Sequence, residues 1–243
     1  MRYKVTLAYN GKNYAGFQSQ KNALAIQDVI ESVLEKIFSK KIHIVISSRT
    51  DAGVHAKGQV FHFDIDQNLD LGKLKFSLNS LLPKDIHIID IKKVSDDFHC
   101  RYSVKKKTYE YLINTGEYDV FLLGYAYQIN YKLDVKKMAK AAKLLKGTHD
   151  FFAFNTTPLS EKPNQVRTIY EFKIIEENDL IRIRVTADGF LRNMVRIMVG
   201  MLVDIGRGNR QIEEIEELLN NPTRSTRRFN IDPNGLYLMK IFY

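Results

Sequence analysis

The sequence is poor in the residues that cross-link a chain or anchor it in a membrane. Its 243 residues include one cysteine, Cys100, five prolines and no tryptophan. A lone cysteine excludes an intrachain disulfide and a multi-cysteine metal site. The apolar runs are too short to span a bilayer, and residues 2–9 follow a strand pattern rather than that of a secretory leader. We therefore expect a cytoplasmic protein without a membrane segment.

Positive charge is in excess. Lys and Arg number 37 against 28 Asp and Glu, which gives a formal charge of +9 and a pI near 9.4. This balance favours a polyanion as partner, although an ordinary basic protein would have the same composition. Basic residues also cluster within residues 101–107, 136–146 and 224–228. These clusters could neutralise phosphates, but the middle one has helical spacing and would equally suit a solvated helix face.

Apolar periodicity predicts an α+β fold. In the first half we expect the order strand, helix, strand, strand, helix, strand, over residues 2–9, 26–38, 42–47, 60–66, 71–82 and 86–94. The second half repeats this order, with strands over 108–114, 124–129, 166–176, 180–187 and 235–243 and helices over 135–145, 190–205 and 211–220. This is the ferredoxin-like (RRM-like) order. We expect two such halves, residues 1–103 and 104–243, with mixed, mainly antiparallel sheets, helices packed on one side and a catalytic cleft between the halves.

One polar loop lies between two apolar strand patterns. It belongs to the stretch ISSRTDAGVHAKGQVFHF, residues 46–63, and it contains Asp51. A loop held between two strands can present a reactive side chain. An Asp close to a glycine is more commonly a turn residue that hydrogen-bonds its own loop, but a carboxylate can also act as a nucleophile.

The same loop carries a resemblance. Arg49 to Ala56, RTDAGVHA, resembles the signature of the TruA family of tRNA pseudouridine synthases, a Gly-Arg-Thr-Asp-x-Gly-Val-His run whose Asp is catalytic. Ser48 stands where the family has Gly. The resemblance implies a cofactor-free, metal-free homodimer that isomerises uridines 38, 39 and 40 in the anticodon arm of tRNA.

A second segment places a charged residue within an apolar helix pattern. Within FLRNMVRIMVG, residues 190–200, Arg196 lies on a helix pattern that is apolar around most of its circumference. The arginine could extend to solvent from the edge of the helix, or it could need an anionic partner. The segment is similar to the family's Met-Val-Arg-x-x-Val-Gly run, whose Arg pairs with the catalytic Asp. The resemblance therefore assigns Arg196 to Asp51, and we include Leu191 as substrate-binding.

Other substrate-binding residues follow from the resemblance. Tyr109 belongs to a basic-x-Tyr-x-Tyr run, and its periodicity alone would suit simple packing in a strand. In the family the equivalent tyrosine stacks on the target uracil. Arg49 is expected to help hold the flipped nucleotide, with Thr50 and His55 beside it. His55 could instead be a loop histidine that shapes the motif, and the six histidines lack metal-ligand spacing.

The resemblance continues to the end of the chain. Gly235-Leu236-Tyr237-Leu238 resembles the family's closing Gly-Leu-x-Leu run, and Asp232 departs from the usual Ala shortly before it. Two alternatives remain: a non-catalytic RNA-binding module, which would need no Asp51, and a nuclease or metal-dependent hydrolase, for which the sequence lacks clustered carboxylates. Whether Asp51 attacks C1′ of the ribose or C6 of the base does not follow from the sequence.

Overall fold

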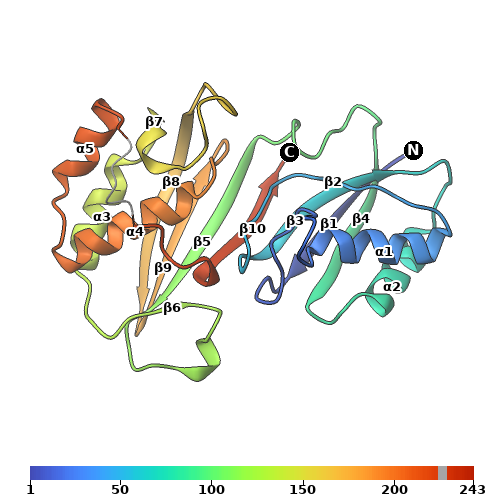
Figure 1. The fold of residues 1–243 in the computed structure, drawn as a ribbon, viewed down its shortest axis with the longest axis horizontal. Helices are drawn as coiled ribbons and strands as arrows, with labels where there is room; N and C mark the ends of the chain where they lie inside the picture. The colour runs from blue at the N-terminus through green and yellow to red at the C-terminus, as the bar shows by residue number, and fades with distance from the viewer. Residues whose placement is uncertain (224–228) are drawn as a thin grey trace. The chain divides into compact units, whose positions relative to one another are not determined.

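The computed structural model describes residues 1–223 and 229–243, in a mixed α and β fold (Figure 1). The chain divides into two compact units, which we call unit 1 (residues 1–105 and 237–243) and unit 2 (residues 106–236). The first boundary was expected after residue 103. We expected the closing strand in the second half, but residues 237–243 belong to unit 1. The predicted basic residues Arg224, Arg227 and Arg228 lie outside the described residues.

Unit 1 is built on one sheet whose central strands run antiparallel in the order β4-β1-β3, while β2 and β10 both pair with β3. Its elements are β1 (Arg2–Tyr9), α1 (Ile26–Phe38), β2 (Val45–Ile46), β3 (His55–Asp64), α2 (Leu71–Leu81), β4 (Ile86–Val94) and β10 (Leu236–Phe242), of which residues from Tyr237 onward lie in this unit.

Alternation along β1 fixes which face of this sheet is buried. Tyr3, Val5, Leu7 and Tyr9 are buried, whereas the residues between them are partly exposed. Helix α1 covers the buried face through an apolar stripe that includes Ile26, Ile30, Val33 and Leu34. Its first backbone N–H, at the cap residue Ala25, donates to the Asp28 carboxylate at 3.1 Å. The strand, helix and strand patterns of the sequence therefore meet in one core.

Two expected strands change length around the predicted loop. We expected strands over 42–47 and 60–66, but β2 is only Val45–Ile46, and β3 begins at His55, inside the motif. β3 extends back to His55 because Tyr237 and Leu238 of β10 pair with His55 and Ala56. The pairing of β2 with β3 is confined to Phe61 and His62.

In unit 2 the strands of the sheet run antiparallel in the order β5-β9-β8-β7, and β6 pairs with β5 in parallel. Helices α3 and α4 pack against each other beside this sheet (Figure 1). Its elements are β5 (Lys106–Asn114), β6 (Tyr127–Gln128), α3 (Val135–Leu144), β7 (Gly147–Asp150), β8 (Val166–Glu177), β9 (Leu180–Ala187), α4 (Met194–Arg207) and α5 (Glu213–Asn220), together with short 3-10 turns.

Helix α4 begins later than the expected residue 190. Asn193 adopts a left-handed conformation with φ of 60°, and the helix starts at Met194. The preceding residues are held by the loop before β8. The Arg192 N–H donates to the Thr157 hydroxyl at 3.0 Å, and the Thr156 N–H donates to the Arg192 carbonyl at 3.0 Å. Apolar periodicity could not reveal these tertiary hydrogen bonds.

The described residues contain no helix with both the length and the apolar character needed to cross a membrane. Within the same residues, no three or more His, Cys, Asp or Glu side chains are grouped so that they could hold a metal ion.

Candidate active site

The Asp51 loop, residues 47–54, connects β2 to β3. Its first residues are held by hydrogen bonds to β3. The Ser47 N–H donates to the Val60 carbonyl at 2.9 Å. The buried Gln59 side chain donates to the Ser48 carbonyl at 2.8 Å. A loop bonded in this way to a central strand is pre-organised, and a side chain that it carries needs little ordering before it acts.

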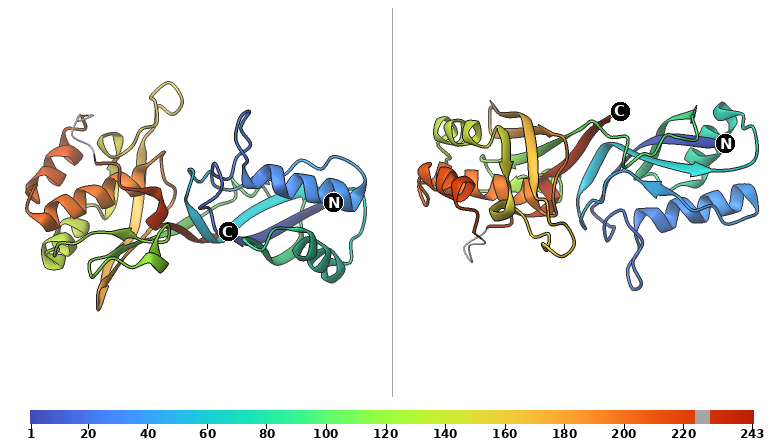
Figure 2. Two further views of the ribbon diagram at one scale, coloured as in Figure 1. Left: turned by 60° about the horizontal axis from the view of Figure 1, so that its bottom comes forward. Right: turned by 90° about the horizontal axis from the view of Figure 1, so that it is seen from above.

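Residues 10–17, which follow β1, support the middle of the Asp51 loop. The Phe17 N–H donates to the Thr50 carbonyl at 3.3 Å, and the Gly53 N–H donates to the Tyr14 carbonyl at 3.4 Å. The Thr50 hydroxyl lies 2.8 Å from the Tyr9 hydroxyl at the end of β1. Beyond Phe17 the same connection projects from unit 1 as a narrow loop before α1 (Figure 2).

Two glycines allow this close backbone contact. A Cβ on Gly11 would lie 2.0 Å from the Val54 carbonyl oxygen, and one on Gly16 would lie 2.4 Å from that of Thr50. Gly16 also has a φ of 90°, in the left-handed region that side chains disfavour. Only glycine therefore fits at these two positions. Sequence analysis found neither glycine as a site residue, because a turn motif shows no tertiary partner.

Asp51 lies at the turn of this loop, half-buried, with the exposed Arg49 two residues before it. The backbone closes after it, since the Val54 N–H donates to the Asp51 carbonyl at 3.2 Å and Gly53 has a φ of 79°. These contacts shape the turn through the main chain. A structural role for Asp51 in the turn therefore does not require its carboxylate.

His55 is buried at the start of β3, where its ring contacts two partners. Its Nδ1 accepts a hydrogen bond from the Gly11 N–H at 3.1 Å, and its ring stacks on that of Tyr237 with centroids 4.7 Å apart. These contacts join β3 to β10 and to the turn after β1. They agree with the interpretation of His55 as a residue that shapes the motif; a substrate contact stays a prediction.

In unit 2, Tyr109 lies on β5 and is 6% exposed. Its ring meets the Phe190 ring edge-on at a centroid distance of 5.1 Å. Tyr111, two residues along, is fully buried and donates its hydroxyl proton to the Asp232 carbonyl at 2.6 Å. Burial, with the Asp232 charge, raises the pKa of Tyr111 well above its usual range. The tyrosine that we expected to stack on uracil therefore lies on a strand whose next tyrosine is locked in the core.

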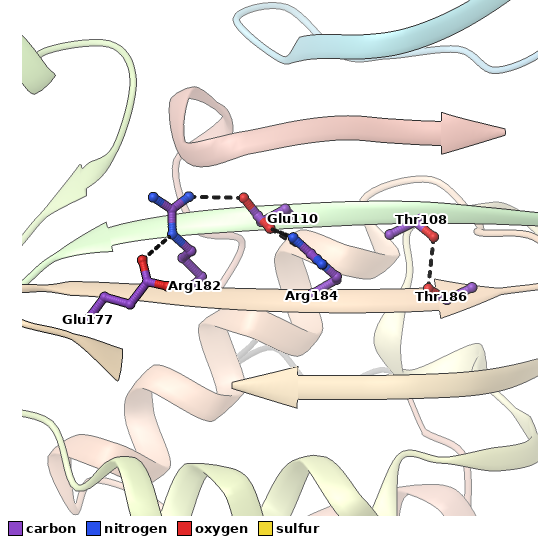
Figure 3. Close-up of polar contacts among 6 residues, drawn as sticks. All are labelled: Thr108, Glu110, Glu177, Arg182, Arg184 and Thr186. Atoms are coloured by element: carbon purple, nitrogen blue, oxygen red, sulfur yellow. Dashed lines mark hydrogen bonds and ion pairs between the residues drawn. The ribbon is translucent and has the colours of Figure 1, made fainter. Parts of the chain in front are cut away.

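The residues that alternate with these tyrosines hold β5 to β9 (Figure 3). The buried Glu110 carboxylate accepts hydrogen bonds from Arg184 at 2.6 Å and from Arg182 at 3.2 Å. The hydroxyls of Thr108 and Thr186 lie 2.8 Å apart on the same pair of strands. These contacts fix β5 in register on either side of Tyr109. We did not single out Glu110 from the sequence, because a charged residue in a strand pattern suggests an exposed face.

Arg196 lies in the first turns of α4 and is part-buried. Its Nε donates to the Ile231 carbonyl at 2.7 Å and its Nη1 to the Asn193 side-chain oxygen at 3.1 Å. The segment that carries Ile231 packs close to the helix, since a Cβ on Gly200 would lie 2.1 Å from the Phe229 carbonyl oxygen. The guanidinium is thus oriented by unit 2 itself. Arg196 therefore does not extend freely to solvent. Of the two interpretations of this residue, the structure favours a charge held in a fixed position.

The structure places Arg49, Thr50 and Asp51 in the Asp51 loop of unit 1, and His55 directly after that loop at the start of β3. It places Tyr109, Leu191 and Arg196 in unit 2, on β5, just before α4 and within α4, respectively. Leu191 is buried at the turn that precedes the helix.

Comparison with known proteins decides the family. A family model described as tRNA pseudouridine synthase matches residues 6–103 and 141–243. The tRNA pseudouridine synthase A of Thermoanaerobacter sp. (strain X514) is 40% identical over 240 residues, which are 98% of each chain. Those of Oceanobacillus iheyensis (41% identical, 100% of this chain and 96% of the relative) and Staphylococcus aureus strain MRSA252 (39%, 100% and 92%) are similar over the same extent.

This chain belongs to the tRNA pseudouridine synthase A (TruA) family. The resemblance predicted from Arg49 to Ala56 is thereby confirmed. The matched residues of the tRNA pseudouridine synthase model include Asp51 and Arg196, whereas Tyr109 lies between the two matched stretches. Among solved structures, a chain of a Cbf5-Nop10-Gar1 complex aligns over 82% of this chain and 54% of its own, with a TM-score of 0.36 and 11% identity, which is too weak a likeness to support an argument.

Proposed function

We propose that the protein converts uridine to pseudouridine in tRNA, at positions 38, 39 and 40 of the anticodon arm. The observation that carries the proposal is the Asp51 loop. It has the TruA signature, and its backbone is bonded to β3 and to residues 14–17 so that one carboxylate is held at a fixed turn. Full-length similarity to proteins named tRNA pseudouridine synthase A supplies the substrate class.

The reaction needs a nucleophile or an ionic stabiliser, but no net redox change. The bond between N1 of uracil and C1′ of the ribose breaks, the base turns, and C5 bonds to C1′. The hydrogen on C5 leaves as a proton, and N1 gains one, so the product is an isomer. An ionised Asp51 can form a covalent intermediate at C1′ or at C6 and so divide one difficult step into two.

The other predicted residues take supporting roles in this proposal. Arg196 forms an ion pair with the Asp51 carboxylate. Tyr109 stacks on the uracil, and Arg49 helps to hold the target nucleotide out of its stack. Thr50, His55 and Leu191 complete the substrate-binding set. Because the Thr50 hydroxyl and the His55 ring already bond within unit 1, they act through the shape of the loop. No cofactor or metal ion takes part, and we propose that the protein acts in the cytoplasm.

A homodimer is the further part of this proposal, and one apolar surface supports it. We call Tyr118, Val120, Phe121 and Leu123 the Phe121 knuckle; all four are exposed, Phe121 by 86%. The segment is nevertheless rigidly held, because the Gln128 side chain bonds both the N–H and the carbonyl of Asp119, at 2.7 and 2.9 Å. A fixed, exposed apolar cluster is typical of a protein interface, and Glu117 and Asp119 make it unsuited to RNA.

We predict that Phe121→Ser shifts the protein from dimer towards monomer. The substitution removes the most exposed apolar ring of the knuckle and touches no core residue, so the melting temperature should stay within about 2 °C. Sedimentation velocity across a concentration series measures the change, with Phe76→Ser, an exposed phenylalanine of α2, as the matched control. A wild-type protein that is monomeric at all concentrations would contradict the prediction.

The proposed activity is tested on unmodified tRNA transcripts. The purified protein is incubated with them in a chelator, and pseudouridine is mapped by chemical adduct formation and primer extension. We expect stops at positions 38 to 40 with the wild type and none with Asp51→Ala. Stops elsewhere would overturn the assigned positions. Tight, salt-sensitive binding without any stops would favour the RNA-binding module.

A further inference from the structure

Unit 1 displays one tyrosine far from the core on a turn that is otherwise firmly anchored. Tyr102 is 79% exposed, although it lies only two residues after the fully buried Cys100. We call residues 99–103 the His99 turn. A large ring that is exposed on such an ordered segment can serve as a stacking surface.

Hydrogen bonds within the His99 turn hold its shape. The His99 Nδ1 accepts from the Arg101 N–H at 3.2 Å and from the Tyr102 N–H at 3.3 Å. The Ser103 N–H donates to the His99 carbonyl at 2.8 Å, and the His99 N–H donates to the Ser103 hydroxyl at 3.0 Å. The Tyr102 ring rests on the His99 ring, with centroids 4.3 Å apart and planes 33° apart. One face of Tyr102 is therefore supported, and its exposure lies mainly on the other.

The sheet of unit 1 anchors this turn from below. The Cys100 N–H donates to His62 Nδ1 on β3, and the Cys100 carbonyl accepts from the Tyr243 hydroxyl at 2.9 Å. The His99 ring also meets the His62 ring edge-on, at 5.1 Å. The platform is thus fixed before any ligand arrives, so stacking on it would cost little conformational entropy.

Charge around the platform indicates the kind of ligand. Arg101 directly precedes Tyr102 and Lys105 follows it by three residues; both are exposed, and residues 101–107 contain four cations and no acid. Two acids, Asp96 and Asp97, precede the turn in the chain. Lys4 adds a cation that lies over the Phe98 and Tyr243 rings, at 5.7 and 5.2 Å from their centroids. Tyr170, another exposed tyrosine, instead has Glu171 beside it.

We propose that Tyr102 stacks on an unpaired nucleobase of the bound tRNA, distinct from the target uridine, while Arg101 and Lys105 contact the adjacent phosphates. The inference rests on the proposed function for the identity of the RNA. An exposed aromatic ring with flanking cations is the arrangement by which proteins hold single-stranded RNA, because every base offers a π-face and every linkage a phosphate. The site adds affinity and takes no part in the chemistry.

The test measures tRNA binding and pseudouridine formation in parallel. We expect Tyr102→Ala to weaken binding of unmodified tRNA about tenfold and to raise KM by a similar factor, with kcat within about twofold of the wild type. Tyr102→Phe should bind like the wild type, since the ring is kept. Tyr170→Ala is the matched control for loss of an exposed tyrosine, and it should bind like the wild type.

Two further arms separate stacking from charge. Arg101→Gln together with Lys105→Gln should lower the salt slope of binding by roughly 1.5, whereas Tyr102→Ala should leave the slope unchanged. Equal binding by Tyr102→Ala and the wild type would overturn the inference, as would equal weakening by Tyr102→Ala and Tyr170→Ala. A wild type that binds tRNA but forms no pseudouridine would instead contradict the proposed function, and the binding arms would still decide the role of Tyr102.

Discussion

The side chain of His62 is a neutral imidazole that contacts the rings of Phe98 and His99. It is 2% exposed on β3 and accepts a hydrogen bond from the Cys100 N–H. Burial, then the nearby charge of Arg2 and the ring of His99, lowers the pKa of His62 from 6.5 to about 4. Unit 1 therefore contains a histidine that stays uncharged at any pH at which the enzyme would work.

This shift predicts a loss of stability in mild acid. Between pH 6.5 and 4 the unfolded chain protonates His62 while the folded chain does not, so the unfolded state binds more protons. The free energy of unfolding should therefore fall as the pH drops through this window, by up to roughly 3 kcal/mol from this residue. Urea denaturation at pH 7 and pH 4.5 measures it.

The matched variant is His62→Asn, which keeps an acceptor near the Cys100 N–H but cannot gain the charge. Its stability should change less between pH 7 and 4.5 than that of the wild type. An identical pH dependence in the two proteins would show that His62 is not buried in its neutral form.

Single residues also show where sequence analysis stops. The Arg-Thr-Asp signature led to the family, which the comparisons confirm, whereas the catalytic role of Asp51 stays a prediction. Tyr9 and Gln59 were not found, although each bonds the Asp51 loop directly. Strand alternation assigns such residues to a face of the sheet, but it gives no information about which distant backbone atom they meet.

At the scale of elements, the Asp51 loop depends on the backbone of another segment. Gly16 approaches Thr50 so closely that any side chain would displace one of the two backbone segments. We predict that Gly16→Ala lowers the rate of pseudouridine formation at least tenfold and destabilises the protein by about 1–3 kcal/mol. The added methyl group would disrupt the close contact with Thr50, and alanine disfavours the positive φ at this position.

Rate and thermal stability of Gly16→Ala are to be compared with those of Gly72→Ala. Gly72 is a helical glycine of α2, and a Cβ there would meet only the Asp70 side chain, at 3.4 Å. Full activity in Gly16→Ala would mean that the Asp51 loop does not need this support.

The pairing of β5 with β9 yields a second prediction at this scale. Glu110→Ala leaves two arginines facing a buried position without their carboxylate (Figure 3). Since Arg182 and Arg184 are partly exposed, the cost is smaller than for a fully buried pair, and we expect a loss of about 2 kcal/mol in the free energy of unfolding.

Glu177→Ala is the natural control, because Glu177 also pairs with Arg182, at 2.8 Å, but on the exposed surface. It should cost less than about 1 kcal/mol. Chemical denaturation of both variants measures the difference. Equal losses would indicate that the Glu110 ion pairs add no more than a surface pair does.

The bounds of elements were predicted well where one apolar period dominates the sequence, and poorly where tertiary contacts override that period. The strands β1, β4 and β9 and the helix α1 have the expected bounds. Helix α4 begins four residues late because Thr156 and Thr157 hold the backbone before Asn193. The short strand β7 was not expected, since four polar residues after a helix show no alternation.

At the scale of the whole molecule, the sequence led to the family and the structure shows how its signature is held. A formal charge of +9 and similarity over the full length to tRNA pseudouridine synthases both favour a tRNA substrate. The order of elements in residues 1–94 was predicted, because local patterns specify it. The return of residues 237–243 to the sheet of unit 1 was not, since a closing strand pattern gives no partner.

The central claim is that the Asp51 carboxylate drives isomerisation of a tRNA uridine. Because C5 loses its hydrogen when it bonds to C1′, tRNA labelled with tritium at C5 of uridine releases the label as the product forms. We would measure this release in a single turnover with excess wild-type enzyme and with Asp51→Asn, and tRNA binding for both. The account predicts release only by the wild type, with binding by the variant within about threefold. Release by Asp51→Asn at the wild-type rate would contradict it.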